Sequence, residues 1–181
     1  MKRLQNKSAI ITGAAGGMGK EEALLFAKEG ANVLATDLQE EKLSQWVQEA
    51  RQSGLNIHWM KHDVTSASDW AQVFQYAVSL FGKVNILINN AGLALGRDSF
   101  EDASMEDWET MLQTNVNGLL YVSKAVVPGM ISRKKGHIIN IGSIAGKEVY
   151  ENGNVYCASK FAVEDRKSTR LNSSHANISY A

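Results

Sequence analysis

Short apolar runs alternate with longer amphipathic stretches along most of this chain. The runs are rich in branched residues and lie at residues 9–11, 33–35, 57–60, 86–88 and 138–141. Between them, apolar residues recur every three or four positions, as on one face of a helix. Because each run is continuously apolar rather than alternating, both faces of the strands are expected to be covered. The pattern predicts an α/β fold with a doubly wound parallel sheet of five strands.

Charge and cysteine content exclude several classes of protein. The 181 residues carry 19 Lys plus Arg against 19 Asp plus Glu, whereas a nucleic-acid-binding protein needs a basic surplus. Cys157 is the only cysteine, and His58 and His62 flank a run that is predicted to be a strand, so no disulfide or metal site is expected. No apolar stretch reaches the ~20 residues that span a bilayer. We therefore expect a one-domain cytoplasmic protein with no membrane segment.

The longest interval between predicted strands lies between the fourth and the fifth. It carries two helical patterns, at residues 105–113 and 116–132. The only proline, Pro128, falls late in the second pattern, where it is expected to kink or shorten the helix.

Residues 165–181 differ in composition from the rest of the chain. They include three basic residues and one acidic residue, and they have no usable apolar face. All seventeen residues match one reading frame of an adapter used in DNA sequencing libraries. We therefore expect this tail to be a disordered, non-native addition, and residues 1–164 to be the natural domain, incomplete at its C-terminus.

A glycine-rich loop follows the first predicted strand. Gly13, Gly17 and Gly19 allow the backbone to turn sharply and to approach a pyrophosphate closely, with Met18 between the last two. A helix is predicted directly after the loop, so that its N-terminal amides face the anion. The strand–loop–helix order favours a phosphate cradle over a simple turn.

Asp37 ends the second predicted strand, eighteen residues beyond Gly19. A carboxylate there accepts hydrogen bonds from both ribose hydroxyls and repels a 2′-phosphate, and no Lys or Arg stands at positions 14–18 to offset it. The sequence therefore favours NAD over NADP, with Leu38 beside the ribose. The alternative is that Asp37 only caps the helix that follows it. Asp63, at the end of the third strand, is a candidate partner of the adenine amino group.

Several motifs in order resemble the short-chain dehydrogenase/reductase family over residues 4–164. The segment from Thr12 to Gly19 resembles the family's Thr-Gly-x-x-x-Gly-x-Gly loop. The other matches are Asp63-Val64 at the adenine, Asn89-Asn90-Ala91-Gly92 after the fourth strand, Asn115 in Asn-Val-Asn-Gly, Ser143 after the fifth strand, and Tyr156 with Lys160 in Tyr-x-x-x-Lys. The resemblance implies a Rossmann-type fold with five of its usual seven strands, an NAD(P)-dependent oxidoreductase, and Asn115, Ser143, Tyr156 and Lys160 as catalytic residues.

The chemistry of these residues agrees with the resemblance. Tyr156 and Lys160 are four positions apart, so on a helix they share a face. A nearby ammonium favours the phenolate and lowers the phenol pKa toward the range useful for proton transfer. Ser143 can stabilise a developing alkoxide on the substrate. As the family implies, Asn115 would hold a water that links Lys160 to solvent, and Tyr156 and Lys160 would also contact the cofactor.

The substrate is expected to be a small carbonyl compound or alcohol. Residues 90–96, 107–111 and 153–156 resemble family members that act on 3-hydroxy acids and serine, which commonly use NADP. The alternative branches are 3-oxoacyl thioester reductases and broad alcohol or steroid dehydrogenases. The family implies a homodimer or homotetramer. A non-catalytic dinucleotide sensor and an interaction module built on residues 105–132 are the competing functions.

The resemblance also implies that two more strands and a substrate lid follow the Tyr156–Lys160 helix in related proteins. Without them, the fifth strand would be an exposed apolar edge, which favours aggregation. The sequence therefore predicts that the 181-residue chain has low stability and little or no activity.

Overall fold

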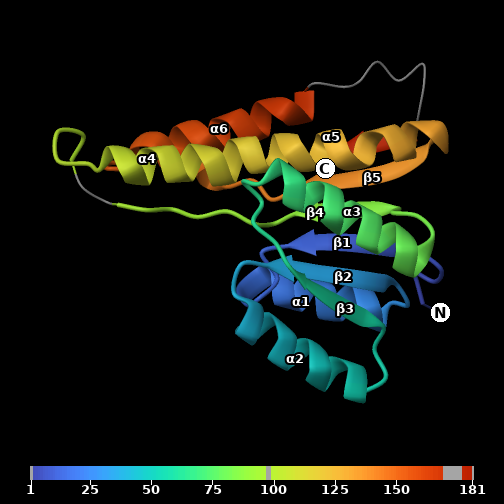
Figure 1. The fold of residues 1–181 in the computed structure, drawn as a ribbon. Helices are drawn as coiled ribbons and strands as arrows, with labels where there is room; N and C mark the ends of the chain where they lie inside the picture. Colours follow the sequence, from blue (N-terminus) through green and yellow to red (C-terminus); the bar gives the residue numbers. More distant parts are fainter. Residues whose placement is uncertain (1, 97–98, 169–176, 181) are drawn as a thin grey trace.

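The computed structural model describes residues 2–96, 99–168 and 177–180 (Figure 1). Six parallel strands form one sheet in the order β3-β2-β1-β4-β5-β6. The strands are β1 (Ser8–Thr12), β2 (Asn32–Asp37), β3 (Ile57–Lys61), β4 (Ile86–Asn89), β5 (Lys135–Asn140) and β6 (Asn177–Tyr180). The chain starts in the middle of the sheet, builds outward to β3, and then returns to β4 on the other side of β1. This order makes β1 and β4 the point at which the direction of winding reverses.

Helices cover both faces of the sheet, as expected for a doubly wound fold. They are α1 (Gly17–Lys28), α2 (Glu40–Gln52), α3 (Ala67–Phe81), α4 (Met105–Leu112), α5 (Gly118–Ser132) and α6 (Asn154–Ser168), with a π-helical segment at Gln113–Asn117 and a 3-10 turn at Ile144–Gly146. Figure 1 shows α1 and α2 on one side of the sheet and α3 and α5 on the other. Side chains on the polar faces of these helices stay in solvent, while their apolar faces pack on the strands.

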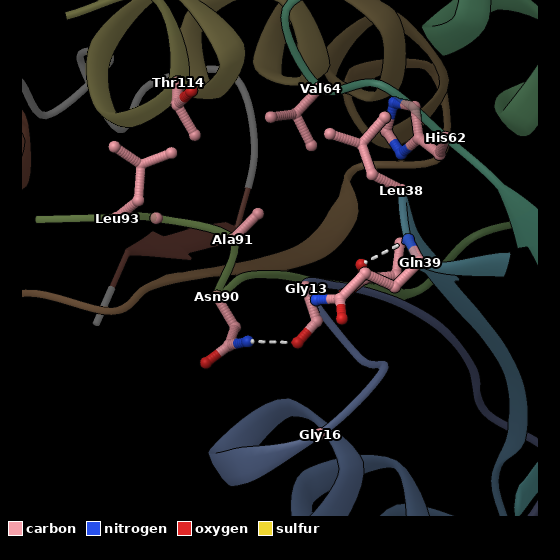
Figure 2. A pocket seen from close by; sticks show the side chains of 12 residues that line it. Gly13, Gly16, Leu38, Gln39, His62, Val64, Asn90, Ala91, Leu93 and Thr114 are labelled. Atoms are coloured by element: carbon pink, nitrogen blue, oxygen red, sulfur yellow. Dashed lines mark hydrogen bonds between the residues drawn. The ribbon is translucent and has the colours of Figure 1, made fainter. Parts of the chain in front are cut away.

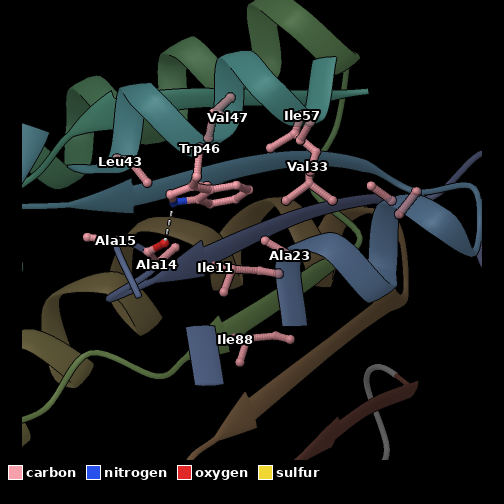
Figure 3. Packing of buried hydrophobic residues seen from close by; sticks show 14 residues of the cluster. Ile11, Ala14, Ala15, Ala23, Val33, Leu43, Trp46, Val47, Ile57 and Ile88 are labelled. Carbon is pink, nitrogen blue, oxygen red and sulfur yellow. Dashed lines mark hydrogen bonds between the residues drawn. The ribbon is translucent and has the colours of Figure 1, made fainter. Parts of the chain in front are cut away.

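Two hydrophobic cores result, one on each face. Adjacent residues of a strand point to opposite faces, so Ile11 belongs to the core under α1 and α2, whereas Ile10 belongs to the core under α3 and α5. In the first core, Trp46 of α2 is almost fully buried, and its indole N–H donates to Ala14 O at 3.0 Å (Figure 3). This bond anchors α2 to the loop that follows β1.

The helix boundaries follow local sequence signals. Ser66 Oγ accepts the Asp69 N–H at the start of α3, and α3 ends at Gly82, whose φ of 74° suits glycine. The two helical patterns expected at 105–113 and 116–132 form one continuous helical stretch through the π-helical segment. Pro128 lies inside α5, and the helix continues past it to Ser132. In the described part of the chain, no helix is long and apolar enough to cross a membrane.

The C-terminal part differs from the sequence-based expectation. All five predicted strands are present, but Asn177–Tyr180 adds β6 in parallel to β5, so β5 is not an edge strand. Residues 165–168 continue α6, while 169–176 and 181 lie outside the described residues. That 165–181 is a disordered, non-native tail remains a prediction. The physical reason for the added strand is that the free backbone N–H and C=O groups along β5 can pair with any extended segment that reaches them.

Candidate functional site

A pocket of about 430 Å³ opens at the carboxyl ends of the central strands (Figure 2). The residues that line it are Gly13, Gly16, Asp37, Leu38, Gln39, His62, Val64, Asn90, Ala91, Gly92, Leu93 and Thr114. They come from the segments that follow β1, β2, β3 and β4, and from the π-helical segment. Ligands of open parallel sheets bind at this edge, where the strand order reverses.

The glycine loop packs against the segment that follows β4. A Cβ on Gly13 would lie 2.8 Å from the Cα of Ala91, and a Cβ on Gly19 would collide with Gly13 O. Asn90 Nδ2 donates to Thr12 O at 2.9 Å and to Gly13 O at 3.0 Å, and Figure 2 shows the second of these bonds. The predicted loop and the predicted Asn-Asn-Ala-Gly motif therefore form one unit.

The other end of the loop is open to a ligand. Nothing lies within 4 Å of a Cβ built on Gly16 or Gly17, and Met18 is 65% exposed. No side chain caps the N-terminus of α1, so its first amides remain available to an anion. The residues present thus fit the pyrophosphate of a dinucleotide.

Asp37 is held with its carboxylate at the pocket wall. Its Oδ2 accepts the N–H of Ala15 at 2.9 Å, and its Oδ1 accepts the N–H of Gln39 at 2.9 Å. A carboxylate has about four acceptor sites, so two backbone bonds leave capacity for ribose hydroxyls. Leu38 is 57% exposed beside it, at the position expected from the sequence.

Asp63 and Val64 lie in different environments. Val64 lines the pocket, whereas Asp63 is not among the lining residues. Asp63 Oδ1 accepts the N–H of Thr65 at 2.8 Å and its hydroxyl at 2.7 Å. Contact of Asp63 with adenine therefore remains a prediction.

The side chains of Ser143, which follows β5, and of Tyr156, in α6, are in contact. The Tyr156 hydroxyl donates to Ser143 Oγ at 3.4 Å, and Ser143 Oγ also accepts the N–H of Ala145 at 3.2 Å. Both side chains are half-buried, so a substrate can reach them. The two residues predicted to act on the substrate oxygen are thus brought together.

Lys160 lies next to this pair in the interior. Its side chain is buried, its Nζ donates to Ile141 O at 3.1 Å, and Nζ lies 5.9 Å from the centre of the Tyr156 ring. Burial lowers the pKa of the Lys160 ammonium. A Cβ on Gly92 would come within 3.5 Å of Lys160 Nζ, so the lysine borders the pocket wall at Gly92.

Asn115 sits in the π-helical segment, a local geometry often found at functional sites. Its side-chain amide exchanges two hydrogen bonds with the backbone of Leu93, each 2.9 Å, and Nδ2 also donates to Ser159 Oγ at 3.0 Å. Ser159 Oγ donates in turn to Tyr156 O at 2.7 Å. Asn115 therefore connects the pocket wall to α6, and its link to Lys160 through a water remains a prediction.

Four further residues of the site, His62, Leu93, Thr114 and Ser159, are not predicted as site residues by the sequence motifs. His62 directly precedes the Asp63-Val64 pair and Ser159 directly precedes Lys160, but proximity to a motif was the only available signal. Their roles depend on contacts between segments that are far apart in the chain.

Known dehydrogenases are similar to this chain in sequence and in structure. The family model described as short chain dehydrogenase matches residues 7–177. The NADP-dependent 3-hydroxy acid dehydrogenase YdfG of Shigella flexneri is 42% identical over 151 residues, which cover 83% of this chain and 60% of the relative. The chain thus spans about 60% of the length of this relative.

Two solved structures illustrate the similarity of fold. Serine dehydrogenase from Escherichia coli has a TM-score of 0.83 at 40% identity, over 89% of this chain and 73% of that one. A short chain dehydrogenase/reductase from Burkholderia phymatum, in complex with NAD, has a TM-score of 0.94 at 29% identity, over 100% of this chain and 66% of that one.

Proposed function

Because the chain belongs to the short chain dehydrogenase family, we propose that it is the nucleotide-binding and catalytic part of an oxidoreductase. The proposed reaction moves a hydride between NAD(H) and a carbonyl or secondary alcohol group. The observation that carries the proposal is the approach of Tyr156 to Ser143, with Lys160 buried near the Tyr156 ring and bordering the pocket at Gly92. The dinucleotide supplies or accepts the hydride when bound.

The chain's own residues handle the proton and the charge on the substrate oxygen. In the direction of reduction, the Tyr156 hydroxyl donates its proton to the oxygen that becomes the alcohol. Ser143 Oγ, 3.4 Å from the Tyr156 hydroxyl, donates a hydrogen bond to the same oxygen and stabilises its developing negative charge. The positive charge of Lys160 favours the phenolate that remains. In the direction of oxidation, the same groups act in reverse, with Tyr156 as the base.

The preferred cofactor is proposed to be NAD(H). The pocket wall carries the carboxylate of Asp37, and no Lys or Arg is among the twelve described residues that line the pocket. A 2′-phosphate at the ribose would therefore meet negative charge without compensation. The relative from Shigella flexneri is named as NADP-dependent, so this preference would distinguish the present chain from that relative.

A binding titration tests the proposal. The 181-residue chain is titrated with NADH and with NADPH, beside Asp37→Asn and the charge-matched control Glu41→Gln, which removes an exposed carboxylate outside the pocket. NADH is expected to bind more tightly than NADPH, and Asp37→Asn should narrow the difference by about tenfold, while Glu41→Gln should leave it unchanged. Equal affinity of the unmodified chain for both would contradict the NAD preference, and no affinity for either would contradict the function itself.

The proposed substrate is a 3-hydroxy acid or a 3-oxoacyl compound. Support comes from the identity of 42% to a 3-hydroxy acid dehydrogenase and of 40% to a serine dehydrogenase. Turnover of a panel of 3-hydroxy and 3-oxo acids tests this assignment, and exclusive turnover of simple secondary alcohols would contradict it.

The chain of 181 residues is proposed to bind dinucleotide but to turn over substrate slowly, because it spans about 60% of the length of these relatives. A whole protein of their length is proposed to assemble as a homodimer or homotetramer. A non-catalytic dinucleotide sensor is disfavoured, since Ser143, Tyr156 and Lys160 are all present.

A further inference from the structure

The imidazole of His62 is held in one orientation inside the pocket wall. The residue is 1% exposed, and its Nδ1 lies 3.0 Å from the hydroxyl of Thr36, which is itself fully buried. The ring packs edge-on against Trp70, with ring centres 4.0 Å apart and planes at 84°. These contacts on two sides fix the direction in which the second ring nitrogen points.

That second nitrogen, Nε2, has no hydrogen-bond partner within residues 2–96, 99–168 and 177–180, although it is shielded from solvent. Leaving a buried polar atom unpaired is costly, so such atoms in native proteins are nearly always satisfied. Among the described side chains, only Glu22 Oε2 is in the same situation, and Glu22 does not line the pocket. His62 does line it, which makes a bound ligand the natural partner for Nε2.

The charge state of the ring suits an uncharged partner. Burial lowers the pKa of His62 to about 4, outweighing the opposite effect of Asp69, Asp63 and Asp37. The ring is therefore neutral near pH 7. The Thr36 hydroxyl can donate to Nδ1 or accept from it, so Nε2 can present either a lone pair or an N–H, as the ligand requires.

The position of His62 relative to Asp37 identifies the part of the ligand. The backbone N–H of His62 donates to Asp37 O at 2.9 Å, so the two residues are neighbours at the ends of adjacent strands. With the adenosine ribose at Asp37, the base would lie among Leu38, His62 and Val64, the pocket-lining residues that follow β2 and β3. Asp63, the polar group expected there, is not among the residues that line the pocket.

We propose that His62 binds the adenine of the dinucleotide, with Nε2 forming a hydrogen bond to the polar edge of the base. Adenine offers both an amino donor and ring-nitrogen acceptors, and the neutral ring can match either. Leu38 and His62 both line the pocket, so a base bound there would lie next to the His62 ring. The inference rests on the proposed function, because it requires a dinucleotide in the pocket.

Paired substitutions separate this contact from a purely structural role. His62→Asn keeps an amide near the Nδ1 position and removes Nε2, whereas His62→Gln carries an amide out to the Nε2 position. His58→Asn is the matched control, because His58 lies in β3, which ends directly before His62, and is outside the pocket. Calorimetry is performed on the 181-residue chain with NADH and with reduced nicotinamide mononucleotide, which lacks the adenosine half.

The expected result is that His62→Asn weakens NADH binding by about tenfold, the usual effect of losing one buried hydrogen bond, without changing the affinity for the mononucleotide. His62→Gln should restore part of the NADH affinity, and His58→Asn should have no effect. Unchanged NADH affinity in His62→Asn, or equal losses for both ligands, would overturn the inference alone. Failure of the unmodified chain to bind NADH would instead contradict the proposed function, and the inference with it.

Discussion

Two regions of the site differ in the length of their hydrogen bonds. Near β1, β2 and β3 the pocket carboxylate forms short hydrogen bonds with the backbone. Near β5 and α6 the two hydroxyl groups predicted to act on the substrate are joined by a long hydrogen bond. Asp37 accepts two backbone N–H groups at 2.9 Å, while the Tyr156 hydroxyl lies 3.4 Å from Ser143 Oγ. The second region also exposes large apolar side chains, including Ile144 at 72% and Val149 at 77%. The half of the site that is proposed to bind the nucleotide is thus fixed by short backbone hydrogen bonds, while the groups proposed to act on the substrate are joined by one long contact.

The largest effect on NADH affinity is expected from a substitution in the glycine loop. Gly19→Val adds a side chain that would meet Gly13 O and Asn90 Nδ2, so the loop must move away from the segment after β4. NADH affinity is expected to fall by about 100-fold or more, because a displaced loop no longer fits the pyrophosphate. Calorimetry measures the loss.

Gly142→Ala is the matched control, since its added Cβ would make ordinary contact with Glu164 at 3.4 Å. It should leave the NADH affinity within about twofold of the original value. Tight NADH binding by Gly19→Val would show that the loop is not the phosphate site.

The buried histidine gives the nucleotide half a defined response to pH. The pKa of His62 falls from 6.5 to about 4 on folding, so the unfolded chain binds a proton that the native chain does not. The free energy of unfolding therefore keeps its full contribution from the neutral ring above pH 6.5. This contribution is lost as the pH falls toward 4, and the total loss is about 3 kcal/mol.

His62→Phe removes this titration and keeps an aromatic ring against Trp70. Urea unfolding at pH 7 and pH 4.5 should show the variant gaining about 2–3 kcal/mol relative to the original chain at the lower pH. The same difference in unfolding free energy at both pH values would contradict a neutral buried His62.

The fold follows from sequence pattern, while the contacts between distant segments do not. The strand predicted from the run at residues 33–35 and the helix predicted directly after the glycine loop depend on local rules of burial and backbone freedom, and both are confirmed. The roles of the site residues remain predictions. Pairing of β6 with β5 and the bond of Ser159 to Asn115 connect segments remote in the chain. No local pattern encodes such pairings, because they depend on which backbone groups remain free after the sheet has formed.

A smaller effect on stability is expected at Ser159, whose hydrogen bonds connect the two halves of the site. Ser159 Oγ accepts from Asn115 Nδ2 and donates to Tyr156 O, and Ser159 is fully buried. Ser159→Ala leaves an amide hydrogen of Asn115 unpaired, so unfolding by urea should show a loss of about 1–2 kcal/mol.

Ser53→Ala provides the control, since Ser53 also bonds a backbone carbonyl, Glu49 O at 3.2 Å, but is exposed. It should change the unfolding free energy by less than about 0.5 kcal/mol. Equal losses of unfolding free energy in the two variants would contradict the stabilising connection at Ser159.

The central claim is that this chain contains a complete dinucleotide site, and titration of the unmodified 181-residue protein with NADH tests it most directly. One NADH is expected to bind per chain, more tightly than NADPH. A folded chain that binds neither nucleotide would contradict the claim.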